Sequence, residues 1–166
     1  MNNLLTEKDY KIIPIDSLEE NGSISMSYIH SQSFKNYWKS KTFLELSKKP
    51  GISIWIAKRR IPLGLIISQS TLDESEIITL AVLPKFRKTG IARNLLKTSL
   101  VYMFKNGVRI CHLEVATNNC AAIKLYATEG FKISGVRKNY YHTDQNLRDA
   151  HLMTKNLNHQ NEITSI

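Results

Sequence analysis

The sequence lacks the features that mark several large classes of protein. Among its 166 residues, no apolar run approaches the roughly 20 residues that a membrane-spanning helix needs. Its first residues, Met1–Lys8, show no basic segment followed by an apolar one, so we expect no signal peptide. The two cysteines, Cys111 and Cys120, do not make a disulfide framework. These absences predict a cytoplasmic protein that is not attached to a membrane.

Internal repeats and low-complexity linkers are also absent from the sequence. A chain of 166 residues can bury a sizeable core without disulfides or metals, and it is most simply one domain. We expect that domain to cover residues 1–156 and a polar C-terminal tail to cover residues 157–166. We expect a monomer or a weak homodimer.

Acidic residues are outnumbered by basic ones, with 14 Asp and Glu against 23 Lys and Arg, for a formal net charge of +9. This excess favours polyanionic surroundings such as CoA phosphates, RNA or a ribosome, and it disfavours small polycations as substrates. The basic residues are scattered rather than gathered in one tract. An ordinary solvated surface therefore explains the charge equally well.

Apolar periodicity and turn residues predict one strand, two helices, three strands, a helix, a strand, a helix and two strands, in that order. Strands are expected at residues 10–15, 52–58, 63–70, 76–83, 109–116, 131–139 and 150–156. Helices are expected at about residues 16–34, 40–49, 91–105 and 121–129. Asp16 or Ser17 is expected to cap the first helix and Ser40 the second. This order predicts a mixed α/β domain with one sheet and helices on both faces.

The most informative stretch is the turn that joins the strand at residues 76–83 to the helix at residues 91–105. It contains the pattern Arg-x-x-Gly-x-Ala, at Arg87, Gly90 and Ala92. A strand that runs into such a turn directs backbone N–H groups and the positive end of the helix dipole at one point, which suits a pyrophosphate. Gly90 lets the backbone approach closely, and Arg87 and Lys88 add positive charge.

A second stretch gives the turn more weight. Residues 113–131 read LEVATNNCAAIKLYATEGF, followed by RKNYYHTD at residues 137–144 and DAHLM at residues 149–153. Together with the turn, these residues resemble the GNAT family of N-acetyltransferases. The second stretch is more specific and is similar to the bacterial ribosomal-protein alanine N-acetyltransferases, the RimI type. The resemblance extends from about Ile77 to Met153 and is weak before Pro50, apart from Trp38.

The resemblance implies a fold and a co-substrate. It implies a single mixed, mainly antiparallel sheet with helices on both faces and a splayed central strand pair. Acetyl-CoA is the implied co-substrate, without a metal, and backbone groups at the splay would bond its pantetheine amides. The implied cofactor-binding residues are Leu80, Ala81, Val82, Arg87, Lys88, Thr89, Gly90, Ile91, Ala92 and Asn119.

Glu114 lies inside an apolar strand, between Leu113 and Val115. A desolvated carboxylate binds a proton more readily, which suits a general base or a group that polarises water. On the sequence alone, a solvent-facing glutamate is the more frequent outcome. The resemblance favours the catalytic alternative, because the glutamate at this place in RimI-type enzymes acts as a base through water.

Tyr126 and Asn119 each have a structural and a functional interpretation. Tyr126 falls within the helix at residues 121–129, where a core tyrosine is the usual outcome. The resemblance implies instead that its phenol protonates the departing thiolate of CoA. Asn119 is expected to cap that helix. The resemblance implies that its amide also touches the pantetheine arm, and both roles can coexist.

Aromatic and acidic residues gather between the last two expected strands. Tyr140 and Tyr141 are either ordinary hairpin aromatics or, by the resemblance, part of the wall where the peptide enters. Asp144 and Asp149 either meet a positive charge on the substrate or form Asx-turns.

Metal and nucleophile chemistry find little support in the sequence. His112 and Glu114 share a strand face, but no third ligand stands at metal spacing, so no metal site is predicted. His142 with Asp144 lacks a nucleophile. Cys120 is expected to be a small packing residue.

The reaction implied by the resemblance is direct attack of a neutral amine on the acetyl-CoA thioester. An α-amino group has a pKa of about 8, against about 10.4 for lysine, so it needs only modest help from a base. Val82 would offer a backbone N–H to the developing oxyanion. The implied acceptor is the N-terminal alanine of a small-subunit ribosomal protein, the eighteenth by the usual count.

Other functions remain open on the sequence. The net charge of +9 would suit an acetyltransferase that acts on aminoacyl-tRNA. An acetyltransferase of small amines is less favoured by the charge. A non-catalytic module that binds acetyl-CoA or RNA is the alternative outside the enzyme class.

Overall fold

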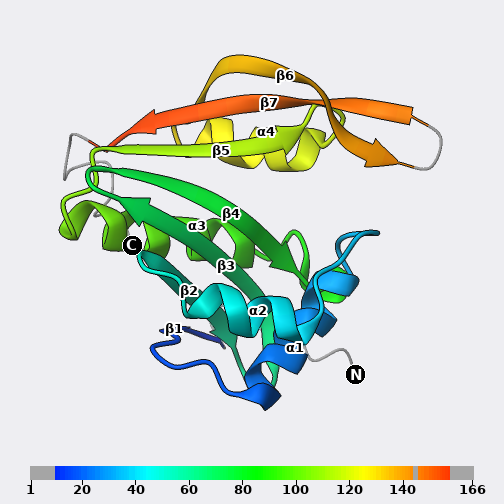
Figure 1. Cartoon of the computed structure of the whole chain (residues 1–166), viewed down its shortest axis with the longest axis vertical. Coiled ribbons are helices and arrows are strands. Elements are labelled where there is room, and N and C mark those ends of the chain that lie inside the picture. The colour runs from blue at the N-terminus through cyan, green and yellow to red at the C-terminus, as the bar shows by residue number, and fades with distance from the viewer. Residues whose placement is uncertain (1–9, 144–145, 158–166) are drawn as a thin grey trace, which may run out of the picture. The chain divides into compact units, whose positions relative to one another are not determined.

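The computed structural model describes residues 10–143 and 146–157, with side chains described except at residues 141–143 and 146–148. Along this part of the chain, the helices and strands follow one another in the order that the sequence predicts, with one short 3₁₀ helix added (Figure 1). The strands are β1 (Lys11–Pro14), β2 (Ile52–Lys58), β3 (Pro62–Thr71), β4 (Glu74–Val82), β5 (Ile110–Ala116), β6 (Lys132–Thr143) and β7 (Asn146–Asn156). The helices are α1 (Glu20–Ser31), α2 (Ser40–Ser47), the short 3₁₀ helix η1 (Pro84–Phe86), α3 (Ile91–Lys105) and α4 (Cys120–Thr128).

The strands pair in the order β1-β2-β3-β4-β5-β7-β6. The pairs β1–β2, β2–β3, β5–β7 and β6–β7 are antiparallel, and β4–β5 is parallel. The prediction of a mixed α/β fold with a mainly antiparallel sheet is therefore confirmed. No helix in the described part of the chain is long and apolar enough to cross a membrane.

The chain divides into two compact units. The first comprises the residues up to Gln69 together with Thr79–Ser99, and the second comprises Ser70–Ile78 together with the residues from Leu100 onward. The single domain expected over residues 1–156 stays a prediction. Leu157, the first residue of the expected tail, is buried, and its N–H donates to the Arg109 carbonyl at 2.7 Å.

The first unit contains the hairpin that the sequence predicts between β2 and β3, with a bulge at Ala57/Lys58. Helix α1 begins later than expected, because the N–H of Ile15 donates to the Ile54 carbonyl and prolongs the strand pairing past β1. Glu19 is therefore the N-cap residue of α1, and the predicted caps at Asp16 or Ser17 are wrong. Helix α2 likewise has Lys39 at its N-cap, so Ser40 is the first helical residue rather than the cap.

The second unit places α4 between β5 and β6 in the sequence, and β7 between them in the pairing order. Strand β5 alternates: Cys111, Leu113 and Val115 are buried, whereas His112 and Glu114 on its other side are half-buried. Strands β6 and β7 extend further toward each other than predicted. Tyr140 and Tyr141 therefore lie within β6, and the prediction that they lie between the last two strands is wrong.

Candidate functional site

The turn between β4 and α3 has the backbone that an anion site needs. Gly90 has φ of +85° and Lys88 has φ of +62°, and α3 begins directly afterwards at Ile91. The N–H of Asn94 donates to the Gly90 carbonyl at 3.0 Å, which closes the first helical turn. An ideal Cβ on Gly90 would meet nothing within 4 Å. The backbone here is thus open on the side that a ligand would approach, and the N–H groups of a first helical turn lack intrahelical acceptors.

Arg87, which is expected to add positive charge at the turn, is exposed, and its contact with the cofactor stays a prediction. Its guanidinium donates to the Val82 carbonyl through Nε at 3.1 Å. Its Nη2 donates to the Gln32 carbonyl at 3.2 Å and to Ser33 Oγ at 3.1 Å. Arg87 therefore ties the end of β4 to the segment after α1. Lys88 is exposed, and it supplies the positive charge beside the glycine turn.

The end of β4 offers backbone rather than side chains. Ala81 and Val82 are buried, and Leu80 is half-buried. Over the described residues, the parallel ladder between β4 and β5 runs from Glu74↔Ile110 to Ile77↔Leu113, so residues 80–82 come after its last pair.

Glu114 is a mostly buried carboxylate, with 15% of its side chain exposed. Its Oε1 accepts from Arg137 Nη1 at 2.8 Å. Its Oε2 is buried and has no hydrogen-bond partner among the described residues. The solvent-facing alternative for Glu114 is therefore wrong. One oxygen is held, and the described residues leave the other open to a further partner.

Arg137 is the residue at this site that sequence reasoning missed. The hydrogen bond and the negative charge of Glu114 raise the pKa of the Arg137 guanidinium above its ordinary value. The guanidinium carbon also lies 4.6 Å from the centre of the Tyr140 ring. A signal was available, since a buried carboxylate requires a partner and the resemblance already included Arg137. The pairing of β6 with β7, which sets this contact, could not be read from the sequence.

Tyr126 and Asn119 belong to α4 and its start. The Tyr126 ring is buried and packs edge-on against Phe131, with ring centres 5.8 Å apart. The packing interpretation of this ring is therefore confirmed, and the proton-donor role stays a prediction. Asn119 Oδ1 accepts the backbone N–H of Ala122 at 3.2 Å, which confirms it as the N-cap residue. Its contact with pantetheine stays a prediction.

The connection between β6 and β7 contains a bulge. Arg137 pairs with Ala150 and Tyr141 with Arg148, so three residues of β6 stand opposite Asp149 alone. The Asp149 Oδ1 accepts the backbone N–H of Asn139, whose φ is +57°. Asp149 thus shapes the backbone across the strand pair. It lies within β7 and bonds a residue ten positions earlier, so the Asx-turn alternative for Asp149 is wrong. Tyr140 is 40% exposed, whereas Asp144 and the side chain of Tyr141 lie outside the described residues.

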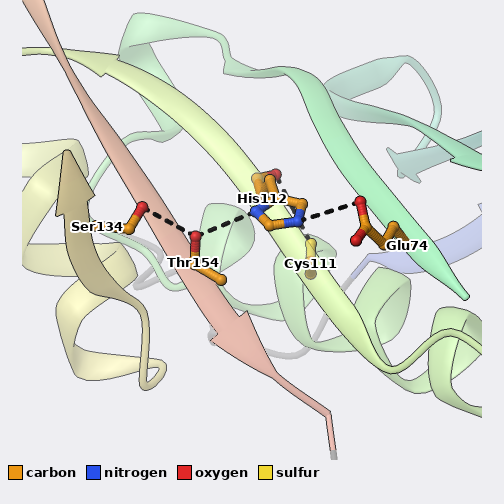
Figure 2. A network of polar contacts seen from close by, with 5 residues as sticks. All are labelled: Glu74, Cys111, His112, Ser134 and Thr154. Atoms are coloured by element: carbon orange, nitrogen blue, oxygen red, sulfur yellow. Dashed lines mark hydrogen bonds and ion pairs between the residues drawn. The ribbon is translucent and has the colours of Figure 1, made fainter. Parts of the chain in front are cut away.

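His112 belongs to a row of polar contacts across the second unit (Figure 2). Its Nδ1 lies 3.1 Å from Thr154 Oγ1, which in turn lies 3.0 Å from Ser134 Oγ. Its Nε2 lies 3.6 Å from Glu74 Oε2. Both ring nitrogens of His112 are therefore occupied by protein groups. Within the described residues, no group of three or more His, Cys, Asp or Glu side chains is placed to hold a metal ion.

The two thiols differ in their surroundings. Burial raises the pKa of the Cys111 thiol to about 12, so it stays protonated near neutral pH. Cys120 is exposed at the first position of α4, and so it is not the buried packing residue that the sequence predicts.

The sequence is similar to a known family of enzymes and to several of its members. The model of the Acetyltransferase (GNAT) family matches residues 23–131. The [ribosomal protein bS18]-alanine N-acetyltransferase of Escherichia coli (strain K12) is 31% identical over 139 residues, which cover 84% of this chain and 94% of that protein. The enzyme of the same name from Salmonella typhimurium is 34% identical over 116 residues, covering 70% of this chain and 78% of that protein.

Solved structures agree with the sequence comparison. The crystal structure of the ribosomal-protein-S18-alanine N-acetyltransferase from Escherichia coli superposes with a TM-score of 0.80 at 29% identity. The superposition covers 89% of this chain and 94% of that one. Arabidopsis thaliana NAA60 in complex with acetyl-CoA superposes with a TM-score of 0.79 over 90% of this chain and 99% of that one. At 21% identity, the second likeness concerns the fold alone.

Proposed function

The chain belongs to the GNAT family of acetyltransferases, and from this premise we propose that it acetylates the N-terminal alanine of ribosomal protein bS18, with acetyl-CoA as donor. The identity of 31% over 84% of the chain with an enzyme of that activity supports the acceptor. The observation that carries the chemistry is Glu114, a mostly buried carboxylate with one oxygen held by Arg137 and the other without a partner among the described residues.

The turn after β4 is the proposed site for the pyrophosphate of acetyl-CoA. The first-turn N–H groups at Ile91 and Ala92 and the positive φ of Gly90 support this assignment. Thr89 Oγ1 donates to the Phe86 carbonyl at 2.7 Å and holds the turn closed. Lys88 contributes charge, and Arg87 acts by fixing the end of β4.

The pantetheine arm is proposed to run along the end of β4. Leu80, Ala81 and Val82 would bond it through their backbone, because their side chains are buried or half-buried. Among the described residues, the β4–β5 ladder ends at Ile77↔Leu113, so it does not engage the backbone of residues 80–82. Asn119 is proposed to add an amide contact while it caps α4.

Acetyl-CoA supplies the acetyl group as an activated thioester. Glu114, through a water molecule, takes one proton from the acceptor's ammonium group and so makes the amine nucleophilic. The amine nitrogen forms the new N–C bond while the backbone N–H of Val82 donates to the carbonyl oxygen as charge develops there. Tyr126 donates its phenolic proton to the sulfur as the C–S bond breaks. After the N–C bond forms, the nitrogen still carries one extra proton, which passes to the Tyr126 phenolate. Glu114 releases its own proton to solvent, so the reaction releases one proton in total.

The acceptor would enter beside β6, where Tyr140 is 40% exposed and Tyr141 follows it in the strand. We propose that residues 1–156 act as one catalytic domain in the cytoplasm, where ribosomal proteins are made. The net charge of +9 suits work close to ribosomal RNA.

The test is intact-mass analysis of an alanine-starting bS18 peptide incubated with the protein and acetyl-CoA. We expect a gain of one acetyl group, and none on a copy whose N-terminus is already blocked. Glu114→Gln should lower the rate by about 10²-fold or more, as loss of a general base does. Glu45→Gln, which changes an exposed glutamate of α2, is the matched control.

A second candidate function, acetylation of aminoacyl-tRNA, is favoured by the net charge of +9. It predicts binding of tRNA that weakens steeply with salt, since phosphate contacts release counterions. Unacetylated peptide together with acetylated aminoacyl-tRNA would favour this candidate. CoA binding without turnover on either acceptor would instead favour a non-catalytic module.

A further inference from the structure

Glu114 and Arg137 form an ion pair whose two side chains differ in their exposure to solvent. The two side chains are 15% and 58% exposed, and a single hydrogen bond of 2.8 Å joins Arg137 Nη1 to Glu114 Oε1. The carboxylate is thus the desolvated partner, whereas the guanidinium reaches it from the more exposed strand β6. An ion pair with one exposed member adds little to the stability of the fold. It is better suited to holding the Glu114 carboxylate in one orientation.

The two oxygens of Glu114 are used differently. Oε1 is held by Arg137, whereas Oε2 is buried without a hydrogen-bond partner in the described part of the chain. A buried carboxylate oxygen without a hydrogen bond destabilises a folded protein. We therefore expect Glu114 Oε2 to take a partner beyond the described residues, such as a water molecule. The orientation of the carboxylate is therefore set through one oxygen and leaves the other available.

Arg137 is itself held in place by the bulge in β6. Its guanidinium lies 4.6 Å from the centre of the Tyr140 ring. The residue between Tyr140 and Lys138, Asn139, has φ of +57°, and its N–H donates to Asp149 Oδ1 at 2.9 Å. In a regular strand, Arg137 and Tyr140 would point to opposite faces, because they are three residues apart. The bulge brings the Tyr140 ring back to the side of Arg137. The sequence thus builds a support for Arg137.

We propose that Arg137 is a positioning residue for acetyl transfer: it grips Glu114 by Oε1 and so presents Oε2 to the water that deprotonates the acceptor amine. This inference rests on the proposed function, because it assigns a role in the same reaction. Arg137 acts through Glu114 and needs no contact with either substrate.

The other charged groups on this side of the sheet do not replace Arg137. On β5, His112 shares the face of Glu114, but its ring nitrogens are engaged by Glu74 and Thr154. On β4, Glu76 pairs in register with His112 and carries the same charge as Glu114. On β7, the residues opposite Glu114 and its neighbour Ala116 are Leu152 and Ala150, which do not titrate. Arg137 on β6 is therefore the cation that the described residues place against Glu114.

The test compares Arg137→Gln with wild type in the peptide acetylation assay, with rates measured against the concentration of each substrate. We expect kcat to fall by about 10-fold to 10²-fold, with the KM for acetyl-CoA within about twofold of wild type. Arg137→Lys keeps a positive charge at this position and should recover part of kcat, whereas Arg137→Gln should not.

Lys138→Gln is the matched control. Lys138 is the next residue of β6, is exposed and carries the same charge. Its substitution should leave kcat and both KM values as in wild type. An Arg137→Gln enzyme with the kcat of wild type would overturn the inference. Equal loss of kcat in Arg137→Gln and Arg137→Lys, or a KM for acetyl-CoA that rises as kcat falls, would also overturn it, since a purely structural role predicts those results.

A second measurement does not depend on the folding of the Arg137 variants. In wild type, the guanidinium protons of Arg137 should exchange with water more slowly than in Glu114→Gln, as followed by NMR. Equal exchange rates in the two proteins would contradict the ion pair and with it the inference. Failure of the proposed function would look different: wild type itself would leave the peptide unacetylated, and the inference would fall with it.

Discussion

His30 Nδ1 accepts the backbone N–H of Trp38 at 3.1 Å, so the imidazole is neutral and its proton sits on Nε2. The ring stacks on that of Trp38, with centres 4.8 Å apart, and also contacts Phe34 and Phe43. His30 is 3% exposed, and burial lowers its pKa from 6.5 to about 4. The segment between α1 and α2 is thus fastened by a histidine that must stay uncharged.

The first unit should therefore lose stability in mild acid. The unfolded chain protonates His30 near pH 6.5 and the folded chain only near pH 4, so the free energy of unfolding falls as pH drops through that window. Between pH 7.5 and 5 the loss due to His30 should be about 2 kcal/mol. Urea unfolding at both pH values measures it. His30→Gln should show a flatter dependence, and an equal dependence in both proteins would contradict the assignment.

Gly90→Ala should affect both folding and co-substrate binding. Its φ of +85° makes any Cβ strained, at about 1 kcal/mol or more. The new methyl group would also project into the open side of the turn, where the pyrophosphate is proposed to bind. We expect the KM for acetyl-CoA to rise about tenfold, which corresponds to about 1.4 kcal/mol.

Gly107→Ala separates these two effects. Gly107 has φ of +87°, and a Cβ there also meets nothing within 4 Å, but it lies after α3 instead of before it. It should lose similar stability in urea unfolding and keep the wild-type KM. If Gly107→Ala raises the KM as much as Gly90→Ala does, the pyrophosphate assignment is wrong.

Tyr126→Phe keeps the ring that packs on Phe131 and removes only the phenol. If the phenol protonates the leaving sulfur, kcat should fall by about 10²-fold with little change in KM. Steady-state kinetics with the alanine peptide measure this, and circular dichroism checks the fold. Tyr102→Phe, at an exposed position of α3, serves as the control. Unchanged kcat in Tyr126→Phe would leave Tyr126 as a core residue alone.

Asn119 allows its two proposed roles to be tested apart. Asn119→Ala should destabilise the protein by about 1 kcal/mol, because the bond from the Ala122 N–H is lost. Asn119→Asp keeps an oxygen acceptor for that N–H but removes the amide donor. Its stability should therefore match wild type while its KM for acetyl-CoA rises severalfold. A wild-type KM in Asn119→Asp would restrict Asn119 to capping.

The local elements could be predicted well wherever the pattern was strong. The predicted bounds of β2 and α3 agree with the structure at both ends, because alternation in one and an apolar stripe in the other run without interruption. On α3, Leu95, Leu96 and Met103 are buried, whereas Tyr102 is 41% exposed.

Features set by distant contacts could not be predicted. The sequence alone gives no reason to expect different partners for the side chains of Arg87 and Arg137. In the structure, Arg87 binds backbone carbonyls and Arg137 binds a buried carboxylate. The partner of each arginine depends on which strand or loop the fold places beside it. The start of α1 was missed for the same reason, since Ile15 is drawn into pairing with Ile54 from 39 residues later.

Strand β7 lies between β5 and β6 in the pairing order, although it is the last of the three in the chain. During synthesis, β6 emerges before the strand it pairs with, and β5 likewise waits for its antiparallel neighbour. Domains generally fold as units and from the N-terminus first, so the hairpin of β2 and β3 can form much earlier. The second unit is instead completed by β7, which emerges after β5 and β6 and pairs between them. A nascent chain stopped before Asn146 would thus carry Glu114 and Tyr126 but not the strand that joins β5 to β6.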